Sequence, residues 1–377
     1  MRVLHIMSGY GGGISSFIRN KAQGVVGHDV VFDVVTYDAC SSAFVQAIQQ
    51  TGGDVYPLSN PKQKGWRAFK ASLENVLQSH VYDVVHCHIS GYRALAYYRI
   101  CRKFRIPKFY IHAHFTLEKN QLTLEQRVNQ WVNRRLSDAY LGCSLEAVYS
   151  AYGWKTPLEQ MMVLPNSIDL DSYQWSDARY DALRTQQRER YGIAKDAHVI
   201  GHIGRLTPIK NHEFTLQLAH LAKQSPQNIQ FLITGAGELE TALKQQVVAE
   251  QLESIVLFTG RVEPIADLYP ALDVLILPSF REGLPTVVVE SQAAGVPVVV
   301  SDTITHEVDL GVDMVEYCAL ADLETWWQAI QTPRPERERA HTSIVQAYFA
   351  NETSAQLYID FLKGNIQHYR IQGGQHE

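Results

Sequence analysis

Two acidic side chains stand eight positions apart in a segment between two apolar runs. Glu282 and Glu290 lie in REGLPTVVVESQAAGVPVVV, which follows the apolar run DVLILPSF. A carboxylate can accept two hydrogen bonds at once, so either residue could hold a ligand that carries neighbouring donors. A glutamate near the start of a helix is often only a partner of the helix dipole. The second glutamate weakens that simpler explanation, and we favour a binding site.

Histidines alternate along two further apolar runs. His86 and His88 lie in VVHCH, and His112 and His114 lie in FYIHAH. Because successive residues of a strand point to opposite faces, each pair is expected to share one face of its strand. For His86 and His88 we favour buried rings that are satisfied within the core. Together with Cys87, the four histidines also contain enough ligands for a zinc ion.

The elements that position these residues are short apolar strands alternating with charged, Leu- and Ala-rich helices. Strands are expected over 3–7, 29–37, 82–88, 109–114, 139–144, 199–206, 229–235, 255–262, 273–279 and 296–302. Helices such as 213–224 and 238–252 lie between them. This alternation indicates βαβ units with a mostly parallel sheet in each half of the chain. The predicted fold class is α/β, with two Rossmann-like doubly wound domains facing a cleft.

The two glutamates belong to a crossover between two of these strands. Parallel neighbours need a connection of about a dozen residues or more, and residues 280–295 are just long enough for a loop and one short helix. Pro285 suits the first helical turn and Gly295 suits the exit. Glu282 then lies at the carboxyl end of a strand, and Glu290 leans back toward the same end from the second helical turn. Ligands of open α/β sheets bind at that edge, where a helix N-terminus attracts phosphate oxygens.

Composition excludes several classes of protein. The 377 residues are 46% apolar and 19% charged, which is enough for two sizeable cores. The five cysteines form no CxxC pair, so a reducing cytosol fits better than a disulfide framework. No apolar stretch approaches the roughly 20 residues of a membrane span, and MRVLHIMSGYGGG reads as a first strand and not as a signal peptide. We expect a cytoplasmic protein, and the isoelectric point near 6.3 argues against nucleic acid as a partner.

Charge is unevenly distributed along the chain. Residues 1–175 hold 18 Lys/Arg against 13 Asp/Glu, a net of +5, and the remainder holds 16 against 26, a net of −10. The segment GYRALAYYRICRKFRIPKFY, residues 91–110, has six basic residues and no acidic one. Basic charge with interleaved aromatic rings can bind an anionic membrane surface or nucleic acid. A solvated helix face is an equally weighted alternative.

The spacing of the two glutamates within EGLPTVVVESQAAGVPVV resembles the signature of retaining glycosyltransferases that use nucleotide sugars and have the GT-B fold. Among these enzymes the match is best to the bacterial family 4 group. Three further segments support the resemblance in the expected order. GGGISSF (11–17) resembles the glycine-rich first loop, and GRLTPIKN (204–211) resembles the segment that opens the second domain. VLPNSID (163–169) resembles the linker strand, with Ser167 in place of the usual glycine. The likeness extends from the N-terminus to about residue 302.

The resemblance implies how a nucleotide-sugar donor would be bound. Arg205 and Lys210 match the pair that binds the diphosphate, where a guanidinium supplies a fork and an ammonium a point charge. Glu290 would accept both ribose hydroxyls, and Glu282 would hold hydroxyls of the donor sugar.

Backbone groups complete the implied donor site. The N–H groups of Gly283 and Leu284 would lie near the sugar, and Val262 would meet the base mostly through its main chain. Gly12 and Gly13 would touch the donor phosphate or the acceptor across the cleft, because glycines let the backbone approach a ligand closely.

The resemblance also implies the reaction, a retaining hexosyl transfer without a metal ion or another cofactor. The leaving diphosphate would take the proton of the acceptor hydroxyl on the same face, while Arg205 and Lys210 stabilise the developing charge. His114, which ends its strand, would orient the donor sugar and the reaction centre by hydrogen bonds, and His112 is the second candidate for this role. His114, Glu282, Arg205 and Lys210 are therefore the predicted catalytic set.

Domain bounds and partners follow from the same likeness and from charge. The hinge is expected within 163–177, between an N-terminal acceptor domain at 1–175 and a C-terminal donor domain at 176–354. The tail, about 355–377, is expected to form a helix that packs back on the first domain. We expect a UDP-sugar donor and a glycan or polyprenyl-diphosphate-linked sugar acceptor in exopolysaccharide, capsule or other cell-surface polysaccharide synthesis. Peripheral contact with an anionic membrane would involve Arg93–Lys108.

Alternative functions remain open at this point. A sugar-nucleotide epimerase on the same fold would convert the donor without any acceptor, and an inactive partner subunit would only bind it. A metal enzyme would use the histidines or Asp169-Leu170-Asp171, which mimics a DxD metal site. However, that Asp-Leu-Asp follows LPNSI and is already explained by the linker match.

Overall fold

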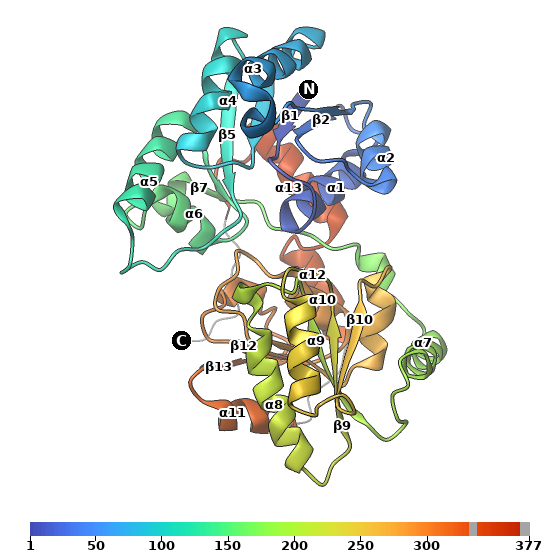
Figure 1. The fold of residues 1–377 in the computed structure, drawn as a ribbon. Helices are drawn as coiled ribbons and strands as arrows, with labels where there is room; N and C mark the ends of the chain where they lie inside the picture. Colours follow the sequence, from blue (N-terminus) through green and yellow to red (C-terminus); the bar gives the residue numbers. More distant parts are fainter. Residues whose placement is uncertain (332–337, 370–377) are drawn as a thin grey trace. The chain divides into compact units, whose positions relative to one another are not determined.

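The computed structural model describes residues 1–331 and 338–369, which form two α/β units (Figure 1). The first unit contains residues 1–168 and the described residues from 348 onward, and the second contains the described residues between 169 and 347. The chain leaves the first unit after Ile168, within the segment 163–177, and returns to it at Tyr348. No helix in the described ranges is both long and apolar enough to cross a bilayer.

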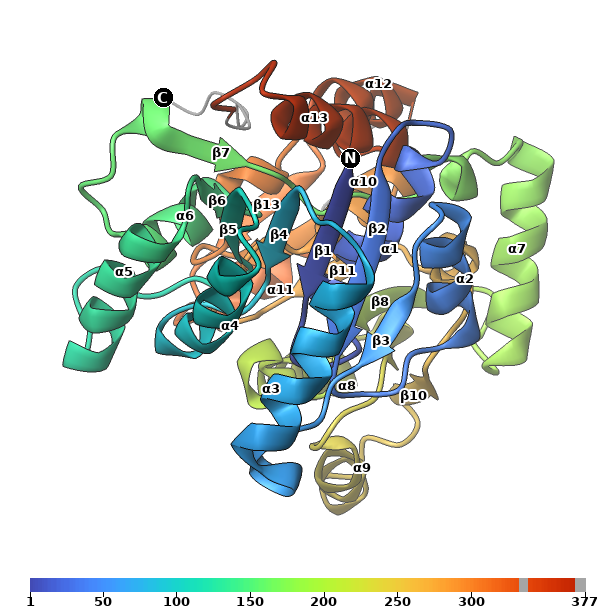
Figure 2. The same cartoon turned by 90° about the horizontal axis from the view of Figure 1, so that it is seen from above.

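The first unit is built on a seven-stranded parallel sheet in the order β3-β2-β1-β4-β5-β6-β7 (Figure 2). Its strands are β1 (Arg2–Ile6), β2 (Val31–Thr36), β3 (Val55–Pro57), β4 (Val84–Cys87), β5 (Lys108–Ala113), β6 (Tyr140–Gly142) and β7 (Met161–Val163). Its helices are α1 (Gly13–Val25), α2 (Ser42–Gln50), α3 (Pro61–Ser79), α4 (Tyr92–Lys103), α5 (Leu124–Leu136), α6 (Leu145–Tyr152), the 3₁₀ turn η1 (Leu158–Gln160) and α13 (Asn351–Lys363).

Helix α13 completes the first unit by packing on α1. A Cβ at Gly24 of α1 would lie 2.4 Å from the Cβ of Ala355 in α13, so only glycine permits this close approach. The buried Lys21 of α1 donates from Nζ to the carbonyl of Pro165 at 2.9 Å and to the hydroxyl of Ser354 in α13. Three segments that are distant in sequence are therefore joined by the buried amino group of Lys21, whose pKa burial lowers well below its usual value.

The second unit contains a six-stranded parallel sheet in the order β10-β9-β8-β11-β12-β13. Its strands are β8 (His198–Ile203), β9 (Ile229–Thr234), β10 (Val256–Gly260), β11 (Val274–Leu277), β12 (Val298–Ser301) and β13 (Val315–Cys318). Its helices are α7 (Asp177–Arg190), α8 (His212–Gln224), α9 (Glu240–Ala249), α10 (Thr286–Ala294), α11 (Leu323–Ala329) and α12 (Glu338–Gln346), with 3₁₀ turns η2 (Leu170–Tyr173), η3 (Pro208–Lys210), η4 (Ile265–Ala271) and η5 (His306–Val308).

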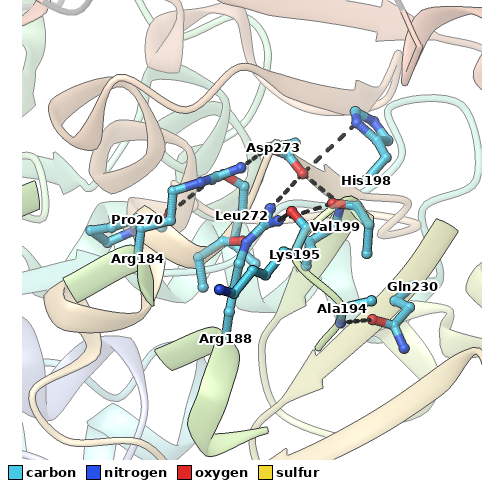
Figure 3. Close-up of polar contacts among 12 residues, drawn as sticks. Arg184, Arg188, Ala194, Lys195, His198, Val199, Gln230, Pro270, Leu272 and Asp273 are labelled. Carbon is cyan, nitrogen blue, oxygen red and sulfur yellow. Dashed lines mark hydrogen bonds and ion pairs between the residues drawn. The ribbon is translucent and has the colours of Figure 1, made fainter. Parts of the chain in front are cut away.

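A charged cluster fastens α7 to the start of β11 (Figure 3). Arg184 and Arg188 of α7 contact the two carboxylate oxygens of Asp273 at 2.6 and 2.7 Å, and the N–H of Val199 donates to the same carboxylate at 2.7 Å. Burial alone would raise the pKa of Asp273, but these partners more than offset it and hold the pKa below its usual value. The cluster fixes the amino end of the strand whose carboxyl end leads to Glu282.

The predicted α/β fold class is confirmed, and β11 and β12 are parallel neighbours as the crossover argument required. Gly295 ends α10 in the left-handed conformation at φ 71°, whereas Pro285 precedes the helix instead of lying in its first turn. The tail helix differs from its predicted range of about 355–377. It begins earlier and ends at Lys363 because Gly364 adopts φ 78°, and the predicted residues 370–377 lie outside the described part of the chain.

A layer of histidines lies in the core of the first unit. We use the name histidine layer for five residues from β1, β4, β5 and the positions directly after β4 and β5: His5, His86, His88, His112 and His114. Phe17 of α1 meets four of the five rings edge-on, at centroid distances between 4.7 and 5.9 Å. The prediction that His86 and His88 are buried is confirmed, with 0% and 7% exposure.

Burial keeps the histidine layer neutral. It lowers the pKa of His5 and of His114 to about 3, and it holds the pKa of the other three rings well below the usual value. The charges that would develop on neighbouring rings, and the ammonium of Lys21, lower the pKa of His86 and His112 further.

Acidification is expected to destabilise the first unit. An unfolded histidine has a pKa near 6.5, so below that pH the unfolded chain binds protons that the folded layer excludes, and the free energy of unfolding falls as the pH decreases. For His5, which is fully buried, the loss at pH 5 is about 2 kcal/mol. Amide hydrogen exchange of β4 at pH 7 and pH 5, corrected for the intrinsic exchange rate, measures this loss. Equal protection of β4 at the two pH values would contradict a neutral layer.

Candidate functional site

The loop after β8 carries the two predicted diphosphate-binding cations. The turn η3 ends at Lys210, and Asn211, at φ 55°, joins it to α8. Neighbouring backbone packs tightly here, since a Cβ at Gly235 would lie 1.9 Å from the carbonyl oxygen of Gly204. Arg205 follows directly and is exposed, whereas Lys210 is largely covered. The loop thus lies closely against the loop after β9, and its arginine is exposed.

The loop after β11 brings Glu282 to Lys210. The N–H of Phe280 donates to the carbonyl of Ile209 at 2.9 Å, which fastens the two loops side by side. The ammonium of Lys210 then contacts the carboxylate of Glu282 at 2.6 Å, and each side chain is 15% exposed. Two predicted site residues that are far apart in sequence therefore form one ion pair. A diphosphate that binds here would share the ammonium with this carboxylate.

Glu290 lies on the second turn of α10 among hydroxyl groups. Its carboxylate accepts from Tyr269 at 2.8 Å and also from the hydroxyls of Thr286 and Tyr173. Burial raises the pKa of Glu290, although these hydroxyls and the charge of Lys210 act in the opposite direction. A carboxylate has about four lone-pair sites, so binding both ribose hydroxyls requires at least one of these three partners to move.

Sequence reasoning missed two residues of this site, Tyr269 and Tyr173. They lie in the 3₁₀ turns η4 and η2, which carry no periodic pattern, and both rings are buried beside Glu290. The Tyr-Pro step at 269–270 was the one local signal of an irregular turn, and it gave no indication of a partner.

The start of α10 lies beside the same loop. Pro285 supplies no side-chain cap and the first turn contains no acidic residue, so no side chain of the first turn neutralises the positive end of the helix. Gly283 and Leu284 lie immediately before it, and Val262 lies in the loop after β10. Because all strands of this sheet are parallel, these loops share one edge with Lys210.

The remaining predicted residues belong to the first unit. Gly12 precedes α1 with φ 80°, a conformation that favours glycine, and Gly13 is the first helical residue. The N–H of Gly11 donates to the hydroxyl of Ser15 at 2.7 Å. His112 is fully buried, whereas His114, just beyond β5, is partly exposed. Of the two residues, only His114 is partly exposed, and its Nδ1 is buried without a hydrogen-bond partner.

Metal-binding side chains gather at the histidine layer. Two groups have ligand-type nitrogens within 4.8 Å of one another: His5 with His86 and His88, and His88 with His112 and His114. Across the described ranges, no such group includes Asp169 or Asp171. Asp169 instead accepts a hydrogen bond from the hydroxyl of Ser172 at 2.6 Å.

Comparisons with known proteins cover nearly the whole chain. Residues 11–172 match the model of "Glycosyltransferase Family 4", and residues 197–332 match that of "Glycosyl transferases group 1". The Bacillus subtilis protein named "Putative glycosyltransferase EpsF" is 31% identical over 374 residues, covering 95% of this chain and 93% of that protein. The Escherichia coli "UDP-Gal:alpha-D-GlcNAc-diphosphoundecaprenol alpha-1,3-galactosyltransferase" is 26% identical over 244 residues, covering 61% of this chain and 60% of its own.

A solved structure shows the same fold. The crystal structure of HepE from Anabaena in complex with UDP and glucose superposes with a TM-score of 0.76 at 21% identity, covering 97% of this chain and 100% of that chain. The resemblance in sequence motifs, the fold and the full-length similarity to EpsF therefore agree, and the chain belongs to the family 4 (group 1) glycosyltransferases with the GT-B fold.

Proposed function

We propose that this chain transfers a hexose from a UDP-sugar to a glycan or a polyprenyl-diphosphate-linked sugar with retention of configuration and without a metal ion. The observation that carries the proposal is the contact of Lys210 with Glu282, because it joins a phosphate-binding cation to a hydroxyl-binding carboxylate. An activated sugar has both groups, with a diphosphate attached directly to the sugar ring. The uncapped start of α10 lies at the same loop and favours an anion.

Each donor-site residue has a distinct role in this proposal. Arg205 and Lys210 pair with the diphosphate oxygens, Glu282 accepts hydrogen bonds from sugar hydroxyls, and Glu290 accepts from the ribose. Gly283, Leu284 and Val262 contribute backbone groups, as do Gly12 and Gly13 of the first unit. His114 orients the transferred sugar by a hydrogen bond. The bound metal that other transferases use to neutralise a diphosphate is replaced by the two cations and the helix terminus.

The proposed reaction balances without a further reactant. The bond between C1 of the sugar and the diphosphate oxygen breaks, and a bond forms between C1 and the acceptor oxygen on the same face. The acceptor proton passes to the departing phosphate oxygen, which becomes the more basic group as the bond breaks. Arg205 and Lys210 stabilise the negative charge that develops there.

The relatives support the choice of donor and acceptor. HepE was crystallised with UDP and glucose and also with UDP-glucose, and the E. coli relative is named for UDP-galactose and a diphosphoundecaprenol acceptor. We extend this chemistry to the present chain and propose a role in cell-surface polysaccharide synthesis. The protein would act in the cytoplasm at the inner face of the membrane.

Membrane contact is proposed through one face of α4. A groove of about 400 Å³ lies between α3 and α4, and its lining combines exposed aromatic rings with cations: Trp66, Lys70, Tyr92, Leu95, Ala96, Arg99, Ile100 and Lys103. Trp66 and Tyr92 are 53% and 52% exposed. Such rings favour a membrane interface, and cations nearby attract anionic lipid. Arg102, by contrast, points elsewhere and pairs with Asp138 at 3.4 Å.

Lys210→Ala and Glu282→Gln are each expected to lower kcat by about 10²- to 10³-fold, because each removes a polar partner that acts on the transferring group. The fold should remain intact, as judged by circular dichroism. Transfer is measured with a radiolabelled donor at saturating concentration. Lys244→Ala is the matched control, since it breaks a comparable but exposed contact with Glu240 at 2.7 Å in the same unit. Near-normal turnover of either site variant would remove its assignment.

Donor binding is expected to stabilise the protein in excess EDTA. At a ligand concentration 100 times Kd, binding adds about 2.7 kcal/mol to the free energy of unfolding. A thermal-shift panel of UDP-, GDP- and ADP-sugars measures this, and the UDP-sugars should give the largest shift. Glu290→Gln should reduce the shift, because a carboxamide cannot accept both ribose hydroxyls equally well. A shift that EDTA abolishes would favour the metal alternative.

Arg99→Ser with Lys103→Ser is expected to lower co-sedimentation with phosphatidylglycerol vesicles about tenfold or more, since each cation near an anionic surface contributes about 1 kcal/mol. Arg102→Ser with Arg105→Ser removes the same charge outside the groove and serves as the control. Equal binding of the two double variants would identify α4 as a merely solvated helix.

A further inference from the structure

Three members of the histidine layer form a hydrogen-bonded chain that ends at His114. Nδ1 of His88 lies 2.8 Å from Nε2 of His114, and Nε2 of His88 lies 3.1 Å from Nδ1 of His5. Both ring nitrogens of His88 are therefore used, and its two partners come from the neighbouring strands β5 and β1. We call this the His114 chain.

A second chain in the same layer does not reach His114. His86 contacts the hydroxyl of Tyr358 through Nδ1 at 2.5 Å and Nδ1 of His112 through Nε2 at 3.0 Å. The two chains run in parallel through the layer, because His86 and His88 stack at 4.5 Å with 16° between their planes. This second chain provides an internal reference for the first.

Counting protons restricts the His114 chain to two arrangements. Each neutral imidazole has one N–H and one lone pair, so three rings supply three protons for two ring-to-ring bonds. The third proton must be at one end, on Nδ1 of His114 or on Nε2 of His5. Neither nitrogen bonds to another residue in the described ranges. Moving the end proton from one site to the other requires the tautomer of all three rings to change together.

Burial favours the arrangement with the end proton on His114. His5 is 0% exposed and its ring packs on Phe32 at 4.5 Å, so an N–H at its far end would be a buried donor without an acceptor. An unpaired buried donor costs about 1–3 kcal/mol, and unpaired donors are rarer in proteins than under-used acceptors. Nδ1 of His114 is also buried and unpaired, but His114 is the one residue of the three that is partly exposed, so a hydroxyl from outside has less protein to displace there than at His5.

We propose that His88 and His5 are positioning residues that hold His114 in the tautomer protonated on Nδ1. The inference rests on the proposed role of His114 toward the donor sugar and specifies its chemistry. His114 offers an N–H donor, which would pair with a hydroxyl or ring oxygen of the sugar, and it cannot act as a base at that nitrogen. His88 sets this polarity by donating from its own Nδ1, and His5 completes it by donating to Nε2 of His88.

The group formed by His5, His86 and His88 is poorly arranged for a metal ion. A tetrahedral zinc ion needs lone pairs that converge on one point about 2 Å from each nitrogen. His86 and His88 stack face to face, so their in-plane lone pairs run side by side and do not converge. In the His114 chain the nitrogens instead face one another at hydrogen-bond distances.

The tautomer of His114 can be measured directly in the wild-type protein. Long-range ¹H–¹⁵N spectra of histidine-labelled protein distinguish a protonated Nδ1 from a protonated Nε2. We expect His114 to be protonated on Nδ1, and protonation on Nε2 overturns the proposal without any variant. Stoichiometric Co²⁺ binding with tetrahedral visible absorption, lost in His88→Gln, also overturns it by assigning the lone pairs to a metal.

Two substitutions of His88 separate positioning from packing. His88→Asn keeps an amide near the position of Nδ1, which faces His114, whereas His88→Gln keeps one near Nε2, which faces His5. His88→Gln should lower kcat by roughly 10- to 100-fold with little change in the KM for donor, as lost orienting partners typically do, and His88→Asn should recover most of it. Tyr358→Phe removes a hydrogen bond from the other chain and should leave kcat and the His114 signals unchanged.

The outcomes distinguish this proposal from the proposed function. Suppose that His114→Ala transfers sugar normally while His88→Gln alters the His114 signals. The proposed role of His114 toward the sugar is then wrong, and the hydrogen-bonded His114 chain is supported. Suppose instead that His114→Ala is inactive while both His88 variants leave the His114 signals and kcat unchanged. The positioning role of His88 and His5 is then wrong, and the proposed sugar transfer is supported.

Discussion

Parallel pairing is the constraint on which the candidate site depends. Because β8 lies between β9 and β11 and all three run the same way, the loops that follow them emerge at one edge. The bond from Phe280 to Ile209 then determines which of these loops touch. The ion pair of Lys210 with Glu282 is a consequence of that backbone contact. The chemistry at this edge is set by strand order first and by side-chain choice second.

The sequence predicted structure best where a local pattern could be combined with the length of the connection between two strands. The crossover requirement placed α10 between two strands although its triple valine favours a strand, and Gly295 marked its end. The short strands β3 and β13 were missed, because three or four residues give no usable alternation. Those strands are defined by pairing with neighbours, which is information that a local window does not contain.

The candidate site was predicted less completely than the fold. The histidine pairs on β4 and β5 were visible as an alternation, but His5 on β1 was not, since it stands alone in its run. Only the pairing register of β1 with β4 places His5 beside His86. Similarly, the hydroxyls around Glu290 come from irregular turns whose positions depend on tertiary packing. Partners that are remote in sequence and lie outside periodic elements are the part that a motif cannot reveal.

The return of the chain to the first unit at Tyr348 has a consequence during synthesis. Helix α13 supplies Tyr358 to the histidine layer and Ser354 to the buried amino group of Lys21. These groups are translated after all the strands that the structure describes in the second unit, since β13 ends at Cys318. The first unit is thus translated first, but its core is completed last, when α13 packs on it. A nascent chain exposes part of that interior until α13 has been made and has folded, which is the interval in which a holding chaperone would be of most use.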